Sequence, residues 1–266
     1  MIVVNNNSGI GNRLKNIVTA MRKADRLGDS LFINFPHQDF FTVYYQPDPS
    51  TVRPEIEVCT TWSLELFEDE IAKGFLKEPK TLKIYHDYNT TFELKNSIDF
   101  QFNNIQEWLI EDIKNYFQLI EFSSLVTDTV DAYVEKFNLS DAIGVHIRTW
   151  SDDQGRHARL HDLSLFTRCM KETSGERFFV ATDSAQCLRE LVEQFPQRII
   201  ASPRLDERHI SKNASLEAMF ASVTDMLVLS KCRRVIGTYS STFTEVAWWL
   251  GGCQKPLTVP LPQVCR

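Results

Sequence analysis

The sequence lacks several features that would each indicate a class of protein. Its six cysteines show no C-x-x-C spacing, which argues against a zinc site of that kind and against a dense disulfide framework. No apolar run approaches the ~20 residues needed to cross a bilayer, and the first residues do not resemble a secretory leader. We therefore expect no transmembrane segment, and either a cytoplasmic protein or a soluble domain trimmed from a protein of the secretory pathway.

An excess of positive charge is also absent, because 29 Lys and Arg residues stand against 35 Asp and Glu residues, a formal net charge of −6. This balance argues against a general nucleic-acid-binding protein, although a local basic pocket can still hold one anionic ligand. The hydrophobic content of 43% and the charged content of 24% are typical of a globular protein. A chain of 266 residues is long enough for one large domain or for two lobes.

Short apolar runs alternate with helical patterns in both halves of the chain. This alternation predicts an α/β protein built from βαβ units with parallel sheets. We expect strands over residues 2–4, 30–35, 82–85, 142–147, 177–181, 198–201 and 234–237, and helices over 14–27, 105–117, 124–137, 163–173, 185–195, 216–230 and 241–250. Gly28 is the expected stop of the first helix, and turn chemistry near residues 138–141 places the boundary between the lobes.

The strand predicted over residues 142–147 carries the most informative motif, because it ends in I-G-V-H-I-R and presents His146 and Arg148 at its carboxyl end. Open α/β sheets bind ligands at this end of their strands. The planar guanidinium of Arg148 suits a phosphate or a carboxylate. The alternative is that Arg148 pairs with an acidic side chain at the surface.

Three other segments follow predicted strands and open predicted helices. The first, Gly9–Arg13, offers backbone N–H groups at a helix start but does not complete the G-x-G-x-x-G fingerprint of dinucleotide-binding proteins. The second places Asp183 where it can accept hydrogen bonds from a base or a ribose, although Asp183 or Ser184 can equally cap the next helix. The third, residues 238–243, offers hydroxyls and N–H groups for a phosphate.

With these motifs in this order, the sequence resembles the GDP-fucose-dependent fucosyltransferases of the GT-B type, which include bacterial and animal α1,6-enzymes, α1,2-enzymes, plant xyloglucan enzymes and protein O-fucosyltransferases. The resemblance rests on G-x-G-N near the amino terminus, G-V-H-I-R, A-T-D-S, Asp225 within V-T-D-M-L-V-L-S, and T-Y-S-S-T-F-T-E-V-A-W-W-L-G-G. No part of residues 36–137 matches. The resemblance implies two Rossmann-like lobes with mainly parallel sheets facing a central cleft: an acceptor-side lobe over residues 1–138 and a nucleotide-sugar-binding lobe over 139–266.

The resemblance also implies an enzyme that transfers fucose from GDP-fucose, with inversion, to a glycan or another hydroxyl acceptor. In it, Arg148 would bind the pyrophosphate and stabilise the leaving GDP, and His146 would face the nucleotide or the transferred sugar. Asp183, with Ser184 beside it, would contact guanosine. The other implied donor-binding residues are Ser240, Ser241, Thr242 and Phe243 around the phosphates, Gly11, Asn12 and Arg13 across the cleft, and Asp225, for which a structural role in a buried helix is equally open.

The sequence departs from the family after Arg148. Many relatives continue H-x-R-R-x-D, whereas here Thr149 and Trp150 follow, and the acids are displaced to Asp152 and Asp153. A second cation near the pyrophosphate would then come from Arg156, Arg159 or Arg13, or the donor differs. Two alternatives therefore stay open: a glycosyltransferase with another nucleotide sugar, and an inactive nucleotide-sugar-binding protein.

We expect no metal and no cofactor, because the chain has no D-x-D motif and Arg148 supplies a cation in place of a divalent ion. The candidates for a catalytic base are Asp152, Asp153, Glu245, His146, His157 and His161. Trp248 and Trp249 are expected in the core. Packing is also the default expectation for Phe40, Phe41, Tyr44 and Tyr45, which could otherwise stack on an acceptor sugar.

Overall fold

The computed structural model describes residues 2–5, 9–28, 31–34, 40–43, 56–60, 82–85, 105, 107–150, 154–202, 216–239 and 241–260. The chain divides into two compact units. The first unit comprises Met1–Ser97 and Glu107–Ser123, and the second unit comprises Ile98–Gln106 and Ser124–Arg266. Tyr44 and Tyr45 lie outside the described residues.

The first unit contains a parallel sheet of four strands in the order β2-β1-β4-β5. Helix α1 (Ile10–Leu27) connects β1 to β2, and its apolar stripe, including Leu14, Ile17 and Met21, is fully buried as predicted. The helix ends at Gly28, whose φ of 58° is the left-handed conformation that a glycine adopts without a steric penalty. The strands are β1 (Ile2–Asn5), β2 (Leu31–Asn34), β4 (Ile56–Thr60) and β5 (Leu82–Tyr85).

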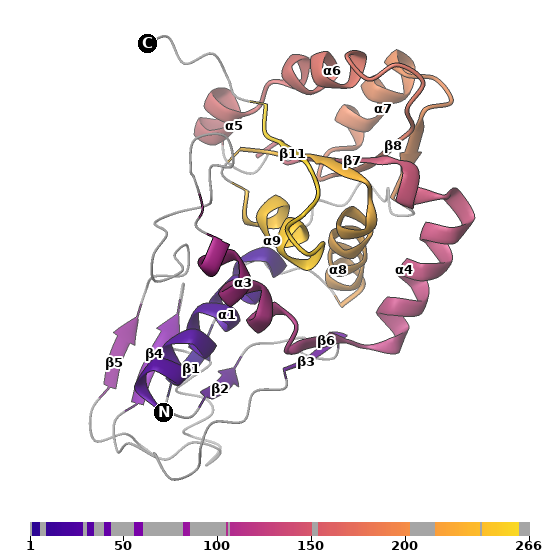
Figure 1. Ribbon diagram of the computed structural model, residues 1–266. Coiled ribbons are helices and arrows are strands. Elements are labelled where there is room, and N and C mark those ends of the chain that lie inside the picture. Colours follow the sequence, from indigo (N-terminus) through magenta and orange to yellow (C-terminus); the bar gives the residue numbers. More distant parts are fainter. Residues whose placement is uncertain are drawn as a thin grey trace. The chain divides into compact units, whose positions relative to one another are not determined.

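A second helix of the first unit lies beside α1. Helix α3 (Glu107–Phe117) packs against α1, and the two run side by side in Figure 1. The short strands β3 (Phe41–Val43) and β6 (Ile120–Phe122) form a separate antiparallel pair. Phe40 and Phe41 are buried, in agreement with a packing role.

The second unit contains a parallel sheet of five strands in the order β11-β10-β7-β8-β9. Its strands are β7 (Ile143–Ile147), β8 (Phe178–Thr182), β9 (Ile199–Ala201), β10 (Arg234–Ile236) and β11 (Leu257–Thr258). Its helices are α4 (Ser124–Phe137), α5 (Gln154–Leu160), α6 (Leu163–Lys171), α7 (Ala185–Gln194), α8 (Leu216–Lys231) and α9 (Thr242–Leu250), with a 3-10 turn at Leu139–Asp141. The prediction of an α/β protein with mainly parallel sheets is confirmed.

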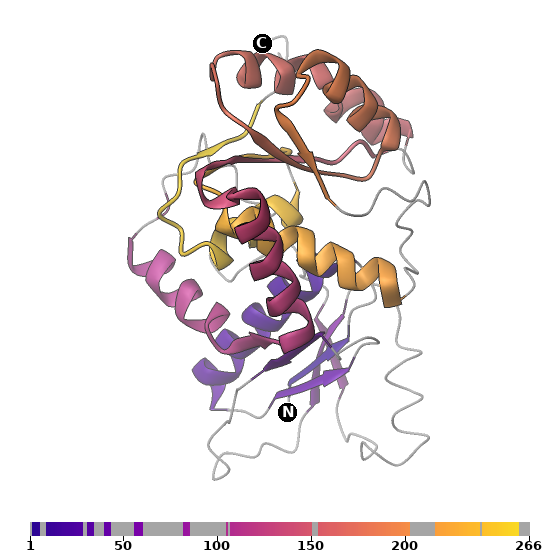
Figure 2. The ribbon, with the colours of Figure 1, turned by 90° about the vertical axis from the view of Figure 1, so that its right-hand side faces the viewer.

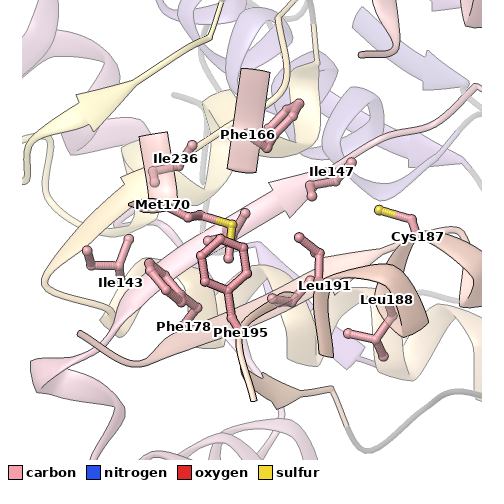
Figure 3. Close-up of a cluster of buried hydrophobic side chains, with 12 residues drawn as sticks. Ile143, Ile147, Phe166, Met170, Phe178, Cys187, Leu188, Leu191, Phe195 and Ile236 are labelled. Carbon is pink, nitrogen blue, oxygen red and sulfur yellow. The ribbon is translucent and has the colours of Figure 1, made fainter. Parts of the chain in front are cut away.

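Alternate residues of β7 and β8 face opposite layers of helices, as the two-residue period of a strand requires. Figure 3 shows one face, where Ile143, Ile147 and Phe178 pack with side chains from α6 and α7 such as Met170 and Leu191. The opposite face is covered by α8. A side chain at Gly144 would meet Leu229 of that helix and Cys232 just after its end, so β7 and α8 pack in close contact.

Helix α4 belongs to the second unit, whereas the sequence places it at the end of an amino-terminal lobe that ends at residue 138. It packs against α8 (Figure 2), and its Tyr133 makes an edge contact with Phe179 of β8. The Tyr133 hydroxyl also donates a hydrogen bond to the carbonyl oxygen of Ala201. By its contacts, α4 is therefore part of the second unit.

Among the residues that the structure describes, no helix combines the length and the apolar character needed to cross a membrane. The described cysteines Cys169, Cys187, Cys232 and Cys253 are free thiols. Burial raises the pKa of both Cys187 and Cys232 to about 12, which makes these two thiols unreactive.

Candidate functional site

The register of the second sheet brings Arg148 and Asp183 together. Ile147 of β7 pairs with Thr182 of β8, so the residue that follows each strand lies opposite the other. On the other side of β7, Val145 pairs with Ile236, which brings the end of β10 to the same place. The carboxyl ends of three adjacent parallel strands therefore meet at one edge of the sheet, where ligands bind in open α/β sheets.

Arg148 and Asp183 form an ion pair at this edge. Nη1 of Arg148 donates to one carboxylate oxygen of Asp183, and the other oxygen accepts the backbone N–H of Thr149 at 2.8 Å. The Asp183 side chain is 9% exposed and the Arg148 side chain 25% exposed, so the guanidinium is the part of the pair that meets solvent. Ser184 instead caps α7 by accepting the N–H of Cys187 at 3.2 Å, so the capping role falls to Ser184.

A hydroxyl of the predicted segment 238–243 ties the end of β10 to β7, a contact that the sequence did not predict. The Thr238 side chain donates to the carbonyl oxygen of His146 at 2.9 Å and accepts the N–H of Arg148 at 2.8 Å. Both backbone groups that flank Ile147 are thereby fixed to the end of the neighbouring strand. This contact could be predicted only by knowing that β10 and β7 are neighbouring strands and in what register they pair.

His146 is almost fully buried between β7 and α9. Its ring stacks on Phe243, with ring centroids 4.6 Å apart, and its Nδ1 lies 2.7 Å from Oγ1 of Thr244. That hydroxyl already accepts the N–H of Thr238 at 3.1 Å, so its own hydrogen is available to Nδ1. Burial lowers the pKa of His146 from 6.5 to about 3, with Asp183 raising it and Arg148 lowering it further. The ring is therefore neutral at neutral pH and a weak base.

The buried neutral ring predicts that stability falls in acid. As the pH falls below 6.5, the unfolded chain takes up a proton at His146 that the folded chain refuses until about pH 3. Between pH 7.5 and 5.5 this uptake costs the folded state about 1.4 kcal/mol. Denaturant titrations at the two pH values should therefore show that the wild type loses about 1.4 kcal/mol more than His146→Asn does. Equal losses in the two proteins would contradict this assignment.

The start of α9 lies beside His146. Ser241 occupies the N-cap position, is buried, and makes no side-chain cap bond there, while Thr242 and Phe243 begin the helix. Glu245 is buried in the first turn and accepts the indole N–H of Trp249 at 3.3 Å. Trp249 and its neighbour Trp248 are buried as predicted.

Helix α5, which the sequence did not predict, brings two histidines to the same edge. The Nδ1–H of His157 donates to the carbonyl oxygen of Thr149 at 2.6 Å, and the ring of His157 stacks on that of His161 at 4.9 Å between centroids. Burial lowers the pKa of His161, and His157 lowers it further, although Asp183 opposes this. The sequence contains both histidines, but their position depends on where α5 lies relative to the end of β7.

The other predicted site residues belong to other elements or lie outside the described residues. Asp225 is half-buried on α8, near Tyr133 of α4. The pKa of Tyr133 is raised first by burial and then by the negative charge of Asp225. Gly11, Asn12 and Arg13 form the first turn of α1 in the first unit rather than a loop before it, and burial lowers the pKa of Arg13 to about 10. Asp152, Asp153, Ser240 and the side chains of Arg156 and Arg159 lie outside the described residues.

No protein-family model and no curated protein matches this sequence. Within the described ranges, no group of three or more His, Cys, Asp and Glu side chains could hold a metal ion. Solved structures of fucosyltransferases share the fold, and three of them illustrate the likeness. NodZ α-1,6-fucosyltransferase soaked with GDP-fucose, an enzyme known from Bradyrhizobium, matches with a TM-score of 0.59 and 20% identity over 94% of this chain and 92% of its own.

POFUT1 in complex with GDP matches with a TM-score of 0.56 and 14% identity, over 97% of this chain and 98% of its own. A mutant of Arabidopsis thaliana FUT1 in complex with GDP matches with a TM-score of 0.55 and 14% identity, over 97% of this chain and 69% of its own. All three likenesses extend over nearly the whole of this chain, so both units take part in them. The chain therefore has the fold of the GT-B-like fucosyltransferases.

Proposed function

We propose that this chain is an inverting, metal-independent glycosyltransferase that moves fucose from GDP-fucose to a hydroxyl group of a glycan or another acceptor. The observation that carries the proposal is Arg148, a guanidinium held by Asp183 at the carboxyl edge of a parallel sheet. Thr238, which binds the N–H of Arg148, is itself bound to Thr244 in the first turn of α9. The fold adds support, because NodZ was soaked with GDP-fucose and the POFUT1 and FUT1 structures hold GDP.

Arg148 would act on the leaving group. As the bond between the anomeric carbon of fucose and the diphosphate oxygen breaks, the sugar becomes oxocarbenium-like and negative charge builds on GDP. A guanidinium placed there stabilises the transition state more than the ground state. Asp183 and Thr238 hold the peptide and the side chain of Arg148 in place, so little reorganisation is needed at the moment of reaction.

The start of α9 would hold the phosphates. Ser240 and Ser241 precede this helix in the sequence, and Thr242 and Phe243 begin it. The amino-terminal N–H groups and the dipole of a helix favour an anion. His146 would line the donor side as a neutral group. We propose further donor contacts from the matching motifs alone. They are those of Asp183, Ser184, Asp225, Gly11, Asn12 and Arg13.

The proton of the acceptor hydroxyl needs a base. His146 is unsuited to this task because of its low pKa, and Glu245 is unsuited because its carboxylate is buried against Trp249. We propose that the base is Asp152, Asp153 or His157. His157 is exposed at the edge that carries Arg148.

A panel of nucleoside diphosphates tests the donor. In a thermal-shift assay in excess EDTA, GDP at about 100 times its dissociation constant should add about 2.7 kcal/mol to the stability, whereas UDP, ADP and CDP should add little. The same buffer with manganese is the control. A response to UDP alone would contradict the fucose assignment, and a response to GDP that requires manganese would contradict metal independence.

A further inference from the structure

Trp150 adopts a backbone conformation that a bulky side chain avoids. Its φ is +57°, in the left-handed region where the Cβ atom crowds the following carbonyl oxygen. Such a conformation persists only where the surrounding structure imposes it, and it recurs at functional sites. The surroundings of Trp150 must therefore explain how this conformation is held in place.

Three elements hold the two residues before Trp150. The N–H of Arg148 is bound at the end of β10 by Thr238, and the N–H of Thr149 is bound at the end of β8 by Asp183. The carbonyl oxygen of Thr149 accepts the Nδ1–H of His157 from α5. With these three peptide groups bound, the path of the chain at Trp150 is set by its neighbours.

This path places the indole beside the guanidinium. The central carbon of the Arg148 guanidinium lies 5.2 Å from the centroid of the Trp150 ring, within the range of a cation–π interaction. Asp183 binds the same guanidinium through Nη1. A carboxylate and an aromatic ring thus restrict one long side chain, which otherwise samples many rotamers.

We propose that Trp150 is a positioning residue for Arg148, and that its strained backbone is retained because it brings the ring against the guanidinium. This inference rests on the proposed function and deepens it. Trp150 acts through Arg148, so its loss should lower kcat more than it raises KM. The residue is the second after the arginine, a position that the family pattern H-x-R-R-x-D leaves open.

Three replacements of Trp150 separate positioning from simple structural support. Trp150→Phe keeps an aromatic face, Trp150→Leu keeps apolar bulk without a π-system, and Trp150→Gly removes the ring but relieves the left-handed conformation. If Trp150 positions Arg148, kcat depends on the presence of an aromatic ring. The kcat of Trp150→Phe then stays within about threefold of the wild type, whereas the kcat of Trp150→Leu and of Trp150→Gly falls about tenfold or more. If Trp150 only supports the structure, kcat follows stability and the Gly variant is the most active of the three.

A measurement without ligand keeps the inference separate from the proposed function. Nitrogen-15 relaxation of the Arg148 Nε–Hε group, assigned by its absence in Arg148→Lys, should show an ordered group in the wild type and in Trp150→Phe, and a mobile group in Trp150→Leu and Trp150→Gly. Equal order in all four proteins would overturn the positioning role, whatever the activity. A wild type that shows this order but neither binds GDP nor transfers fucose would overturn the proposed function and leave the contact itself supported.

Discussion

Replacing Arg148 with alanine is expected to lower the turnover of GDP-fucose about a hundredfold or more, because it removes the cation that meets the charge developing on GDP. Arg148→Lys should lose less, since it keeps a positive charge but lacks the planar fork that binds two oxygens at once. The measurement is kcat for fucose transfer, with GDP binding followed by calorimetry. A catalytically inactive binding protein would have no turnover to lose.

A second arginine of the same unit provides the matched control. Arg233 forms an ion pair with Glu176 at 2.7 Å, just before the starts of β10 and β8, at the opposite edge of the same sheet. Arg233→Ala should leave kcat unchanged. Arg148→Ala also leaves the largely buried Asp183 without its partner, so the melting temperature of each variant must be recorded to show that the protein is folded. A folded Arg148→Ala variant with normal turnover would contradict the proposed role.

Replacing Gly237 with alanine is expected to destabilise the second unit by about 3 kcal/mol or more. The new Cβ atom would lie 2.1 Å from Cγ2 and 2.8 Å from Oγ1 of Thr244, far inside van der Waals contact. Thr244 cannot turn away freely, because its hydroxyl binds both His146 and the N–H of Thr238. Helix α9 cannot withdraw freely either, because Val246, Trp248 and Trp249 are buried on it.

A double-mutant cycle identifies the cause of this loss. Thr244→Ala removes the two closest atoms, so the double variant Gly237→Ala with Thr244→Ala should be clearly more stable than the sum of the two single losses predicts. Denaturant titration of the four proteins gives the coupling free energy. Strict additivity would show that the loss at Gly237 does not arise from the contact with Thr244.

Most elements of the second unit were predictable because their signals are local. The apolar runs that form β7 and β8 are buried on both faces, as parallel central strands are, and the helices between them show a clear apolar stripe. In the first unit, α1 was equally clear from its stripe and from Gly28. The elements that were missed are short or polar: β3, β4, β6 and β11 have two to five residues, and α5 has seven. Segments of this length carry too little periodicity to identify.

The assignment of α4 shows a different limit. Its own residues predicted the helix with the bounds that the structure has, Ser124–Phe137. Its neighbours, however, are α8 and β8, which lie far along the chain, and no local pattern specifies such a contact. The helix therefore joined the second unit although the turn after it had suggested a boundary.

Part of the candidate site could likewise be predicted from local sequence, and part depends on tertiary contacts. Residue type and strand position already indicated that His146 and Arg148 would be presented at the end of β7, because a strand end and a cationic side chain can be recognised within six residues. The structure alone decided that Asp183 is the partner of Arg148, that Thr238 and Thr244 hold the backbone and the imidazole, and that Trp150 lies against the guanidinium. The physical reason is that such contacts depend on which strands are neighbours and in what register, and these are set by the packing of the whole unit.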